Sequence, residues 1–168
     1  MTLGKEDAIN MIKDEWMLVT AGTKDRFNTM TANWGGLGWL WNKPVAFVFI
    51  RPERFTHGFT EENERMTLSF YKEDYRKALQ ICGTKSGRDI DKVKATGLTP
   101  MELESGAMTF EEARMTLDCR KLFQTEMAEA NFIDKDVLEL WYKGAAHGGG
   151  GGYHTIYVVE IEKIIEND

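Results

Sequence analysis

The stretch KPVAFVFI occupies residues 43–50, and the dipeptide Arg51-Pro52 follows it directly. From position 45 onward every residue of the stretch is apolar, which is typical of a β-strand that is covered on both faces. Pro52 has no N–H to donate to a neighbouring strand, so we expect the strand to end before it. The stretch therefore predicts a buried β-strand that leads into a loop headed by an arginine.

Further strands are predicted on both sides of this stretch. Residues 114–126 suit a long strand, but their apolar positions change phase near Lys121, which predicts a β-bulge there. Residues 66–71 alternate between apolar and polar side chains, as a half-buried strand does. The dipeptide Lys24-Asp25 is the expected turn of a hairpin. The remaining strands are expected at residues 16–22, 26–31, 99–110 and 153–165.

Helical segments fall between the predicted strands. Asp74, Asp89 and Asp134 stand where N-caps are expected, because a carboxylate accepts hydrogen bonds from the first free N–H groups of a helix. Gly83 and Gly97 are the expected stops. The helices are expected at residues 5–14, 56–63, 74–82, 89–96 and 134–140. The density of short strands favours a mainly β fold, a barrel with appended helices.

Composition and charge exclude several classes of protein. A length of 168 residues favours a single domain, residues 1–168. The net charge of −6 argues against a general nucleic-acid binder, which needs a cationic face. No long apolar run is present, so we expect no membrane span, and residues 1–7 lack the apolar core of a signal peptide. Two distant cysteines, Cys82 and Cys119, are expected to be reduced and buried, which favours a cytoplasmic protein.

Three short polar segments interrupt the predicted strands and helices. The first, NTMTANWGG, spans residues 28–36. Its hydroxyl-bearing residues and glycines permit a ligand to approach the backbone, whose N–H groups suit the oxygens and nitrogens of a flat ring. Met30 is soft enough to lie against such a ring. The same residues also fit an ordinary strand and turn with a methionine in the core.

The second segment, RPERFT, spans residues 51–56. Arg51 and Arg54 carry planar forks of N–H donors, and Thr56 adds a hydroxyl and a backbone N–H. The segment lies where a strand gives way to a loop or to the start of a helix, and helix N-termini favour anions. It therefore suits a phosphate group. Solvated arginines paired with neighbouring glutamates are the alternative.

The third segment, SGRD, begins at Ser86 and precedes a predicted helix. Ser86, the backbone of Gly87, and Lys85 or Lys92 suit the phosphate side of a ligand. In the alternative interpretation, Asp89 only caps the helix.

The histidines and a run of glycines are further candidates. His154 opens the last predicted strand and is the better site candidate among the three histidines, although a structural role competes with it. The histidines lack a matching cluster of cysteines or acidic residues, so no metal site is expected. Five consecutive glycines at residues 148–152 predict a flexible loop. No GxGxxG motif stands between a strand and a helix, so we expect no Rossmann nicotinamide domain.

Taken together, the three segments resemble the flavin reductase-like family, close to its flavoredoxin branch, over nearly the whole chain. The matching stretches are NTMT at 28–31, IRP at 50–52 with Arg54 and Thr56, SGRD at 86–89 with Asp91-Lys92, and HTIY at 154–157. The resemblance implies a mainly β fold with appended helices, an FMN-binding split β-barrel of Greek-key type. It also implies a homodimer with FMN near the interface.

The resemblance also implies roles for individual residues. Backbone groups of the first segment would hold the flavin ring, and Trp34 and Trp39 would wall the substrate side. The cofactor-binding residues on the ring and ribityl side would be Asn28, Thr29, Met30, Thr31 and Ala32. Those on the phosphate side would be Arg51, Arg54, Thr56, Ser86 and Lys92. No side chain is expected to act as a catalytic acid or base, because the flavin carries the redox chemistry.

The activity that the resemblance implies is that of a flavin reductase-like oxidoreductase. Hydride or electrons would pass from NAD(P)H or another donor through FMN to an acceptor, either a protein or a small molecule. NAD(P)H would bind transiently over the flavin. Two alternatives stay open: a flavin-binding electron carrier without nicotinamide activity, and a split-barrel binding protein that has lost flavin.

Overall fold

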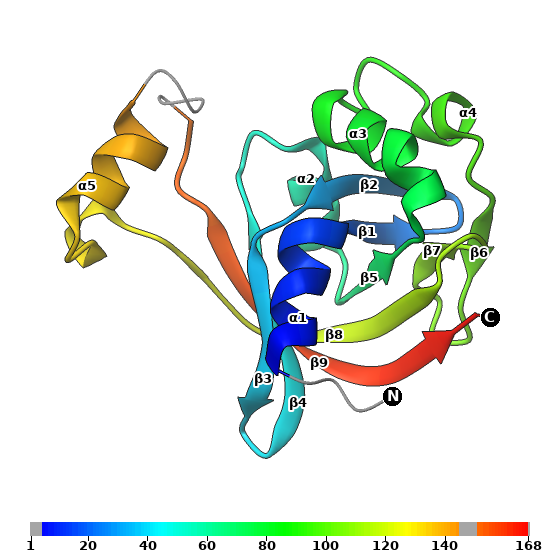
Figure 1. The fold of residues 1–168 in the computed structure, drawn as a ribbon, viewed down its shortest axis with the longest axis horizontal. Coiled ribbons are helices and arrows are strands. Elements are labelled where there is room, and N and C mark those ends of the chain that lie inside the picture. The colour runs from blue at the N-terminus through cyan, green and yellow to red at the C-terminus, as the bar shows by residue number, and fades with distance from the viewer. Residues whose placement is uncertain (1–4, 145–150, 168) are drawn as a thin grey trace.

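The computed structural model describes residues 5–144 and 151–167 of the chain (Figure 1). Within these residues, seven strands form one antiparallel sheet in the order β2-β1-β5-β8-β9-β4-β3, and β6 and β7 form a short hairpin. The strands are β1 Met17–Thr23, β2 Arg26–Ala32, β3 Gly35–Leu40, β4 Lys43–Ile50, β5 Arg65–Phe70, β6 Pro100–Glu102, β7 Met108–Phe110, β8 Met115–Glu126 and β9 Thr155–Glu166. The predicted mainly β fold is confirmed.

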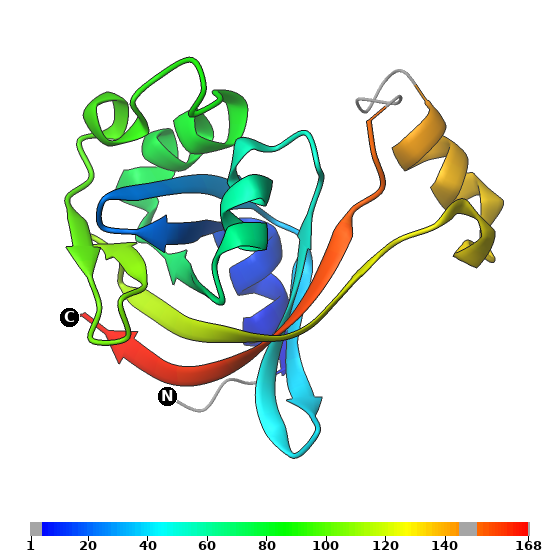
Figure 2. The same ribbon diagram turned by 180° about the vertical axis from the view of Figure 1, so that it is seen from behind.

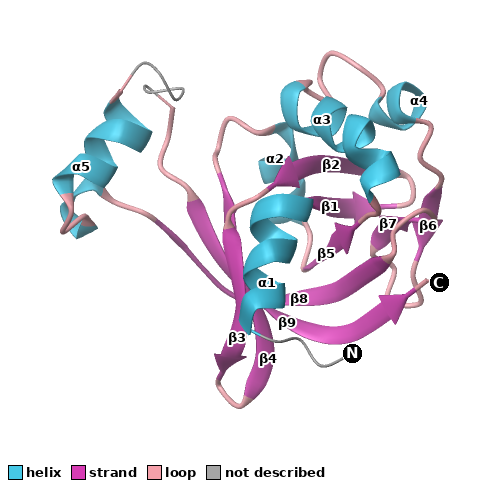
Figure 3. Ribbon diagram, viewed as in Figure 1, coloured by secondary structure: helices cyan, strands magenta, loops and turns pink. Residues whose placement is uncertain are grey.

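Short helices are packed on this sheet or lie at its end. The helices are α1 Lys5–Asn10, α2 Phe55–Glu62, α3 Arg76–Thr84, α4 Lys92–Thr96 and α5 Lys135–Leu138. Short π-helical segments, Met11–Glu15 and Glu139–Lys143, continue α1 and α5. Figure 3 shows α3 and α4 on the side of the barrel formed by β1 and β2. Among the helices that are described, none is long and apolar enough to cross a membrane.

The sheet closes into a split barrel because the chain joins its two edges. β2 and β3 stand at opposite ends of the hydrogen-bonded order, yet only Asn33 and Trp34 separate them in the chain. A connection this short spans at most about 11 Å, so the sheet must curl until its edges approach each other. Gly35 permits the corner: its φ is +155°, and a Cβ there would lie 2.7 Å from the carbonyl oxygen of Phe47.

Strand β3 is not among the predicted strands, although it pairs with the predicted strand β4. The sequence GGLGWL contains three glycines, which weaken a strand and offer little side chain to pack. β3 nevertheless pairs with β4 along its whole length, from Gly35 opposite Val48 to Leu40 opposite Lys43. Phe47 and Phe49, which point to the same face of β4, are only partly buried. The prediction that the strand at 43–50 is covered on both faces is therefore wrong at these two positions.

Strand β5 departs from its predicted burial in the opposite direction. Its alternating pattern predicts a half-buried strand, but all residues from Met66 to Phe70 are buried. The polar side chains face the β6–β7 hairpin. Thr67 donates a hydrogen bond to the carbonyl of Met108 at 2.7 Å, and the hydroxyls of Ser69 and Thr109 lie 2.8 Å apart. The alternation thus reflects a hydrogen-bonded interior face instead of a solvated one.

Two apolar clusters hold the fold together. The larger cluster fills the barrel and includes Val19, whereas the smaller lies between the outside of β1 and α3 and includes Leu18 and Leu79. Successive residues of a strand point to opposite faces, so β1 contributes to both clusters. The free thiols of Cys82 and Cys119 are buried, one in each cluster, as predicted.

The predicted irregularity in the long strand is confirmed. In the β8–β9 register Lys121 pairs with Val159 and Phe123 with Val158. Leu122 is therefore the extra residue of a β-bulge. The phase change in the apolar pattern marks this bulge correctly.

The predicted helix ends are partly right. Asp134 caps α5 by accepting hydrogen bonds from two backbone N–H groups, as expected. α4 begins after Asp91, whose carboxylate caps it, so the prediction for Asp89 is wrong by two residues. Asp74 is not an N-cap either, because it lies within a 3-10 turn that precedes α3. Helix α3 also continues through Gly83 and ends one residue later.

β8 and β9 continue beyond the barrel and carry α5 away from it (Figures 1 and 2). We call residues 127–144 together with 151–154 the arm. Its aromatic side chains pack on one another: the rings of Tyr142 and Tyr153 stack with centroids 5.2 Å apart, and Phe132 lies at the same distance from Tyr142. Most of the predicted glycine loop at 148–152 lies outside the described residues.

Candidate functional site

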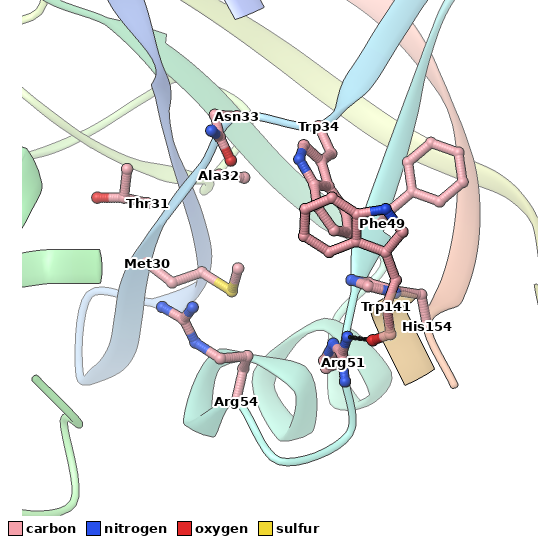
Figure 4. A pocket seen from close by; sticks show the side chains of 10 residues that line it. All are labelled: Met30, Thr31, Ala32, Asn33, Trp34, Phe49, Arg51, Arg54, Trp141 and His154. Atoms are coloured by element: carbon pink, nitrogen blue, oxygen red, sulfur yellow. Dashed lines mark hydrogen bonds between the residues drawn. The ribbon is translucent and has the colours of Figure 1, made fainter. Parts of the chain in front are cut away.

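A cleft of about 280 Å³ opens where the end of β2, the loop after β4 and the arm meet (Figure 4). Its lining residues are Met30, Thr31, Ala32, Asn33, Trp34, Phe49, Arg51, Arg54, Trp141 and His154. The first and second polar segments therefore face the same cleft. Residues that are about twenty positions apart in the sequence meet here because the barrel brings the ends of β2 and β4 together.

The third polar segment packs directly against the other two. Gly87 lies so close to Asn28 that a Cβ on the glycine would be 2.2 Å from the side-chain oxygen of Asn28. The amide of Asn28 donates a hydrogen bond to the hydroxyl of Thr56 at 2.8 Å. Arg88 donates to the carbonyl of Glu53 at 3.1 Å. The three segments thus contact one another behind the wall of the cleft, and the third segment contributes no lining residue.

Lys92 lies behind the wall of the cleft and is almost fully buried. Its ammonium donates hydrogen bonds to the carbonyls of Thr29 in β2, at 2.7 Å, and Cys82 in α3, at 2.8 Å. Burial lowers the pKa of Lys92 to about 8. Arg54 donates to the same Cys82 carbonyl at 3.4 Å, and burial also lowers its pKa. The lysine therefore ties β2 to α3 and places a cation close beneath the cleft.

Side chains of the first segment alternate across β2. The hydroxyl of Thr29 donates to the carbonyl of Val19 and accepts from Thr20, so this side chain faces away from the cleft. The hydroxyl of Thr31 donates to the carbonyl of Leu79 in α3. Met30 is the side chain of this segment that lines the cleft from within the barrel core. Much of what the segment offers a ligand is therefore backbone.

Arg51 connects the cleft to the arm. Its guanidinium donates a hydrogen bond to the carbonyl of Trp141 at 2.6 Å and lies over the ring of Tyr142, 4.9 Å from the centroid. Figure 4 shows this contact on the opposite side of the cleft from Thr31. A guanidinium carries five N–H donors, so this bond leaves others to face an anion.

His154 and Tyr142 form a neutral pair at the base of the arm. The hydroxyl of Tyr142 and Nδ1 of His154 lie 2.6 Å apart. Burial, assisted by the nearby positive charge of Arg51, lowers the pKa of His154 to about 4. Burial raises the pKa of Tyr142. Both side chains are therefore uncharged at neutral pH, and His154 lines the cleft as an uncharged imidazole.

The predicted residues divide into three groups. Met30, Thr31, Ala32, Arg51 and Arg54 line the cleft, whereas Asn28, Thr29, Thr56 and Lys92 support it from behind. The hydroxyl of Ser86 accepts a hydrogen bond from the N–H of Arg88 and shapes the turn of the third segment. Trp34 lines the cleft, but Trp39 does not and is 68% exposed on β3.

Two lining residues, Phe49 and Trp141, lie outside everything that the sequence analysis singles out, whereas Asn33 belongs to the first polar segment without being named there. Phe49 belongs to a run of apolar residues that looks like core throughout. Trp141 lies ninety residues after Arg51 in the chain, and only the projecting arm brings the two together. The adjacent aromatic residues Trp141 and Tyr142 in a polar helix were the available signal. Among the described residues, no group of three or more histidine, cysteine or acidic side chains is arranged to hold a metal ion.

The chain belongs to the flavin reductase-like family. The sequence model described as flavin reductase like domain matches residues 11–168. The expected family is thereby confirmed. A search of curated protein sequences finds no significant match.

Solved structures show the same fold. An FMN-binding protein from Thermus thermophilus with bound p-hydroxybenzaldehyde has a TM-score of 0.69 at 21% identity, over 91% of this chain and 71% of that chain. A flavoredoxin of Desulfovibrio vulgaris (Miyazaki F) has a TM-score of 0.69 at 23% identity, over 91% and 69% of the two chains. An NADH:FAD oxidoreductase of Streptomyces globisporus C-1027 has a TM-score of 0.66 at 16% identity, over 91% and 75%. The likeness confirms the split-barrel fold.

Proposed function

We propose that this protein binds FMN in the cleft and acts as a flavin-dependent oxidoreductase. Membership of the flavin reductase-like family supports a flavin-related reductase or flavoprotein. The observation that carries the more specific proposal is the convergence of the three polar segments, seen in the contacts of Asn28 with Gly87 and Thr56. A ring-binding backbone and a cationic loop then share one cleft.

The ring side of the cleft fits a flavin. The backbone that leaves β2 at Ala32 and Asn33 borders the cleft, and the sulfur-bearing side chain of Met30 is part of its wall. Trp34 and Trp141, in edge-to-face contact at 4.9 Å, wall the other side. Bound FMN would supply the redox chemistry, and the residues named here would hold and orient its ring. No side chain needs to act as a catalytic acid or base.

The opposite end of the cleft fits a phosphate. A phosphate monoester carries roughly −1.5 to −2 charges at neutral pH. Arg51 and Arg54 line the cleft, and Lys92 lies beneath it. Gly87 is packed against the side chains of Asn28 and Phe55, which places the third segment beside the first and second segments. We propose that Arg54 and the turn at Ser86 hold the phosphate, with Arg51 contributing from the arm side.

We also propose that the protein is a homodimer and that NAD(P)H or another donor reduces the flavin for a small-molecule or protein acceptor. The arm supports the dimer, because two of its apolar residues are exposed, Ile133 to 99% and Leu140 to 48%. Projecting apolar side chains of this kind are typical of surfaces that meet a partner. Sedimentation of the purified protein measures the oligomeric state directly.

The experiment that tests the function is an FMN titration followed by a nicotinamide assay. We expect the purified protein to be yellow or to take up added FMN at a stoichiometry of about one per chain, and then to oxidise NADH or NADPH. Failure to bind FMN under any condition contradicts the proposal. Uptake of FMN without oxidation of either nicotinamide would instead indicate an electron carrier.

A further inference from the structure

A second cavity of about 410 Å³ lies between the arm and the barrel. It adjoins the cleft, because Trp34, Phe49, Trp141 and His154 line both. We call it the arm cavity. Its volume is within the range of about 300–1,000 Å³ that is typical of small-molecule sites. A molecule in the arm cavity would therefore lie directly beside whatever occupies the cleft.

The walls of the arm cavity are aromatic or apolar. Phe49 contributes from the barrel, and Met127, Phe132 and Val137 contribute from the arm. No charged side chain lines it among the residues that the structure describes. Rings pack well in edge-to-face or offset contacts, and buried charges need partners that these walls do not offer. The cavity therefore favours a flat, uncharged molecule over an ionic one.

The polar group best placed to orient such a molecule is the imidazole of His154. The Tyr142 hydroxyl lies 2.6 Å from Nδ1 of this histidine and 3.2 Å from the sulfur of Met127. An imidazole nitrogen is a much better acceptor than a thioether, so the hydroxyl proton goes to Nδ1. The neutral imidazole then carries its own proton on Nε2, and no hydrogen bond within the described part of the chain uses that N–H.

We propose that the arm cavity is a subsite for an uncharged aromatic carbonyl compound, whose ring packs among the aromatic side chains and whose oxygen accepts a hydrogen bond from Nε2 of His154. The proposal rests on the proposed function only in making this compound the reaction partner of the flavin. Binding to the cavity itself does not require FMN. The two proposals therefore have separate tests.

Acetophenone and ethylbenzene are matched probes, because they share a ring and a shape and differ in the carbonyl oxygen. We titrate each into flavin-free protein and follow tryptophan fluorescence and the imidazole N–H signals by NMR. Acetophenone is expected to bind about threefold to tenfold more tightly than ethylbenzene, because this ratio corresponds to the net free energy of one neutral hydrogen bond. It is also expected to shift the Nε2–H signal of His154. Equal affinities with an unmoved histidine signal would overturn the role of His154.

The substitution Val137→Trp fills the cavity from the arm side, because Val137 lines the arm cavity but not the cleft. We expect acetophenone affinity to fall at least about tenfold while FMN affinity stays the same. Lys135→Trp is the matched control, since this arm residue is exposed and lines neither the cleft nor the arm cavity, and it should change neither affinity. Unchanged acetophenone binding in Val137→Trp overturns the proposal. A second outcome also overturns the proposal: the wild type does not bind acetophenone, and Val137→Trp changes the oligomeric state. Both results together would show that a protein surface fills the cavity.

Discussion

The barrel and the arm border the same cleft, but they are held in place in different ways. The barrel wall is part of a continuous hydrogen-bonded sheet over a buried core. The arm leaves the barrel at the ends of β8 and β9 and is tied back by the second polar segment. Arg51 donates to the carbonyl of Trp141, and Glu53 accepts from the N–H of Gly152. A region held by a few such contacts opens at a lower free-energy cost than a core strand does.

The two halves of the candidate site are therefore held in position by different parts of the fold. The ring and phosphate side is built into the barrel, where Lys92 joins β2 to α3. The aromatic side depends on where the arm rests. Changes in the barrel half should therefore abolish binding of the ligand, whereas changes in the arm half should adjust it.

The largest effect is expected from Gly87→Ala in the barrel half. The added Cβ would lie 2.2 Å from the Asn28 oxygen, and Asn28 cannot easily move because its amide is bonded to Thr56. We expect FMN affinity to fall about 100-fold, or about 2.7 kcal/mol. Titration of flavin fluorescence measures it. Gly58→Ala is the matched control, since a Cβ there meets nothing within 4 Å. Equal affinities in the two variants would show that the third segment is not part of the site.

Arg51→Ala tests the connection between the two halves. It removes both a charged donor facing the cleft and the hydrogen bond to Trp141. We expect a loss of about 1.5–2 kcal/mol in FMN binding, together with faster amide exchange in residues 135–144. Arg26→Ala is the control, because Arg26 pairs with Glu62 on an exposed surface. If FMN affinity does not change in Arg51→Ala, the phosphate-side role of this arginine is wrong.

The pH dependence of stability tests the neutral pair at the base of the arm. The pKa of His154 is lowered to about 4 by burial, whereas the unfolded chain has a value near 6.5. Between these pH values the unfolded chain takes up a proton that the folded chain does not. The free energy of unfolding should therefore fall by about 1–1.5 kcal/mol from His154 as the pH drops from 7 to 5.5. Urea unfolding at both pH values measures it, and His154→Gln should show a smaller drop.

Tyr142→Phe should have the smallest effect, because it removes one hydrogen bond and leaves the ring under Arg51. We expect the protein to lose about 1 kcal/mol of stability. The pKa of His154 should change more visibly than the stability does, and NMR titration of the imidazole would detect this. A variant with an unaltered histidine titration would contradict the paired arrangement.

Local patterns in the sequence were sufficient for many elements of the barrel. The phase change near Lys121 correctly marks the β-bulge, and Asp134 correctly marks the start of α5. Such features depend on neighbouring residues, so the sequence contains them directly. The predicted burial of β5 was wrong because its polar face meets the distant β6–β7 hairpin instead of water. Strand β3 was not predicted because its three glycines give no strand pattern. Only its pairing with β4 makes this segment a strand.

By itself, the sequence determined the strand-rich character of the fold, the family and the three polar segments that approach one another. These depend on residue type and short-range order, and the physical preferences of each segment are local. Only the tertiary structure decided that Arg51 reaches Trp141 and that Tyr142 meets His154. Closure of the barrel and projection of the arm set these long-range distances, and no local preference encodes them.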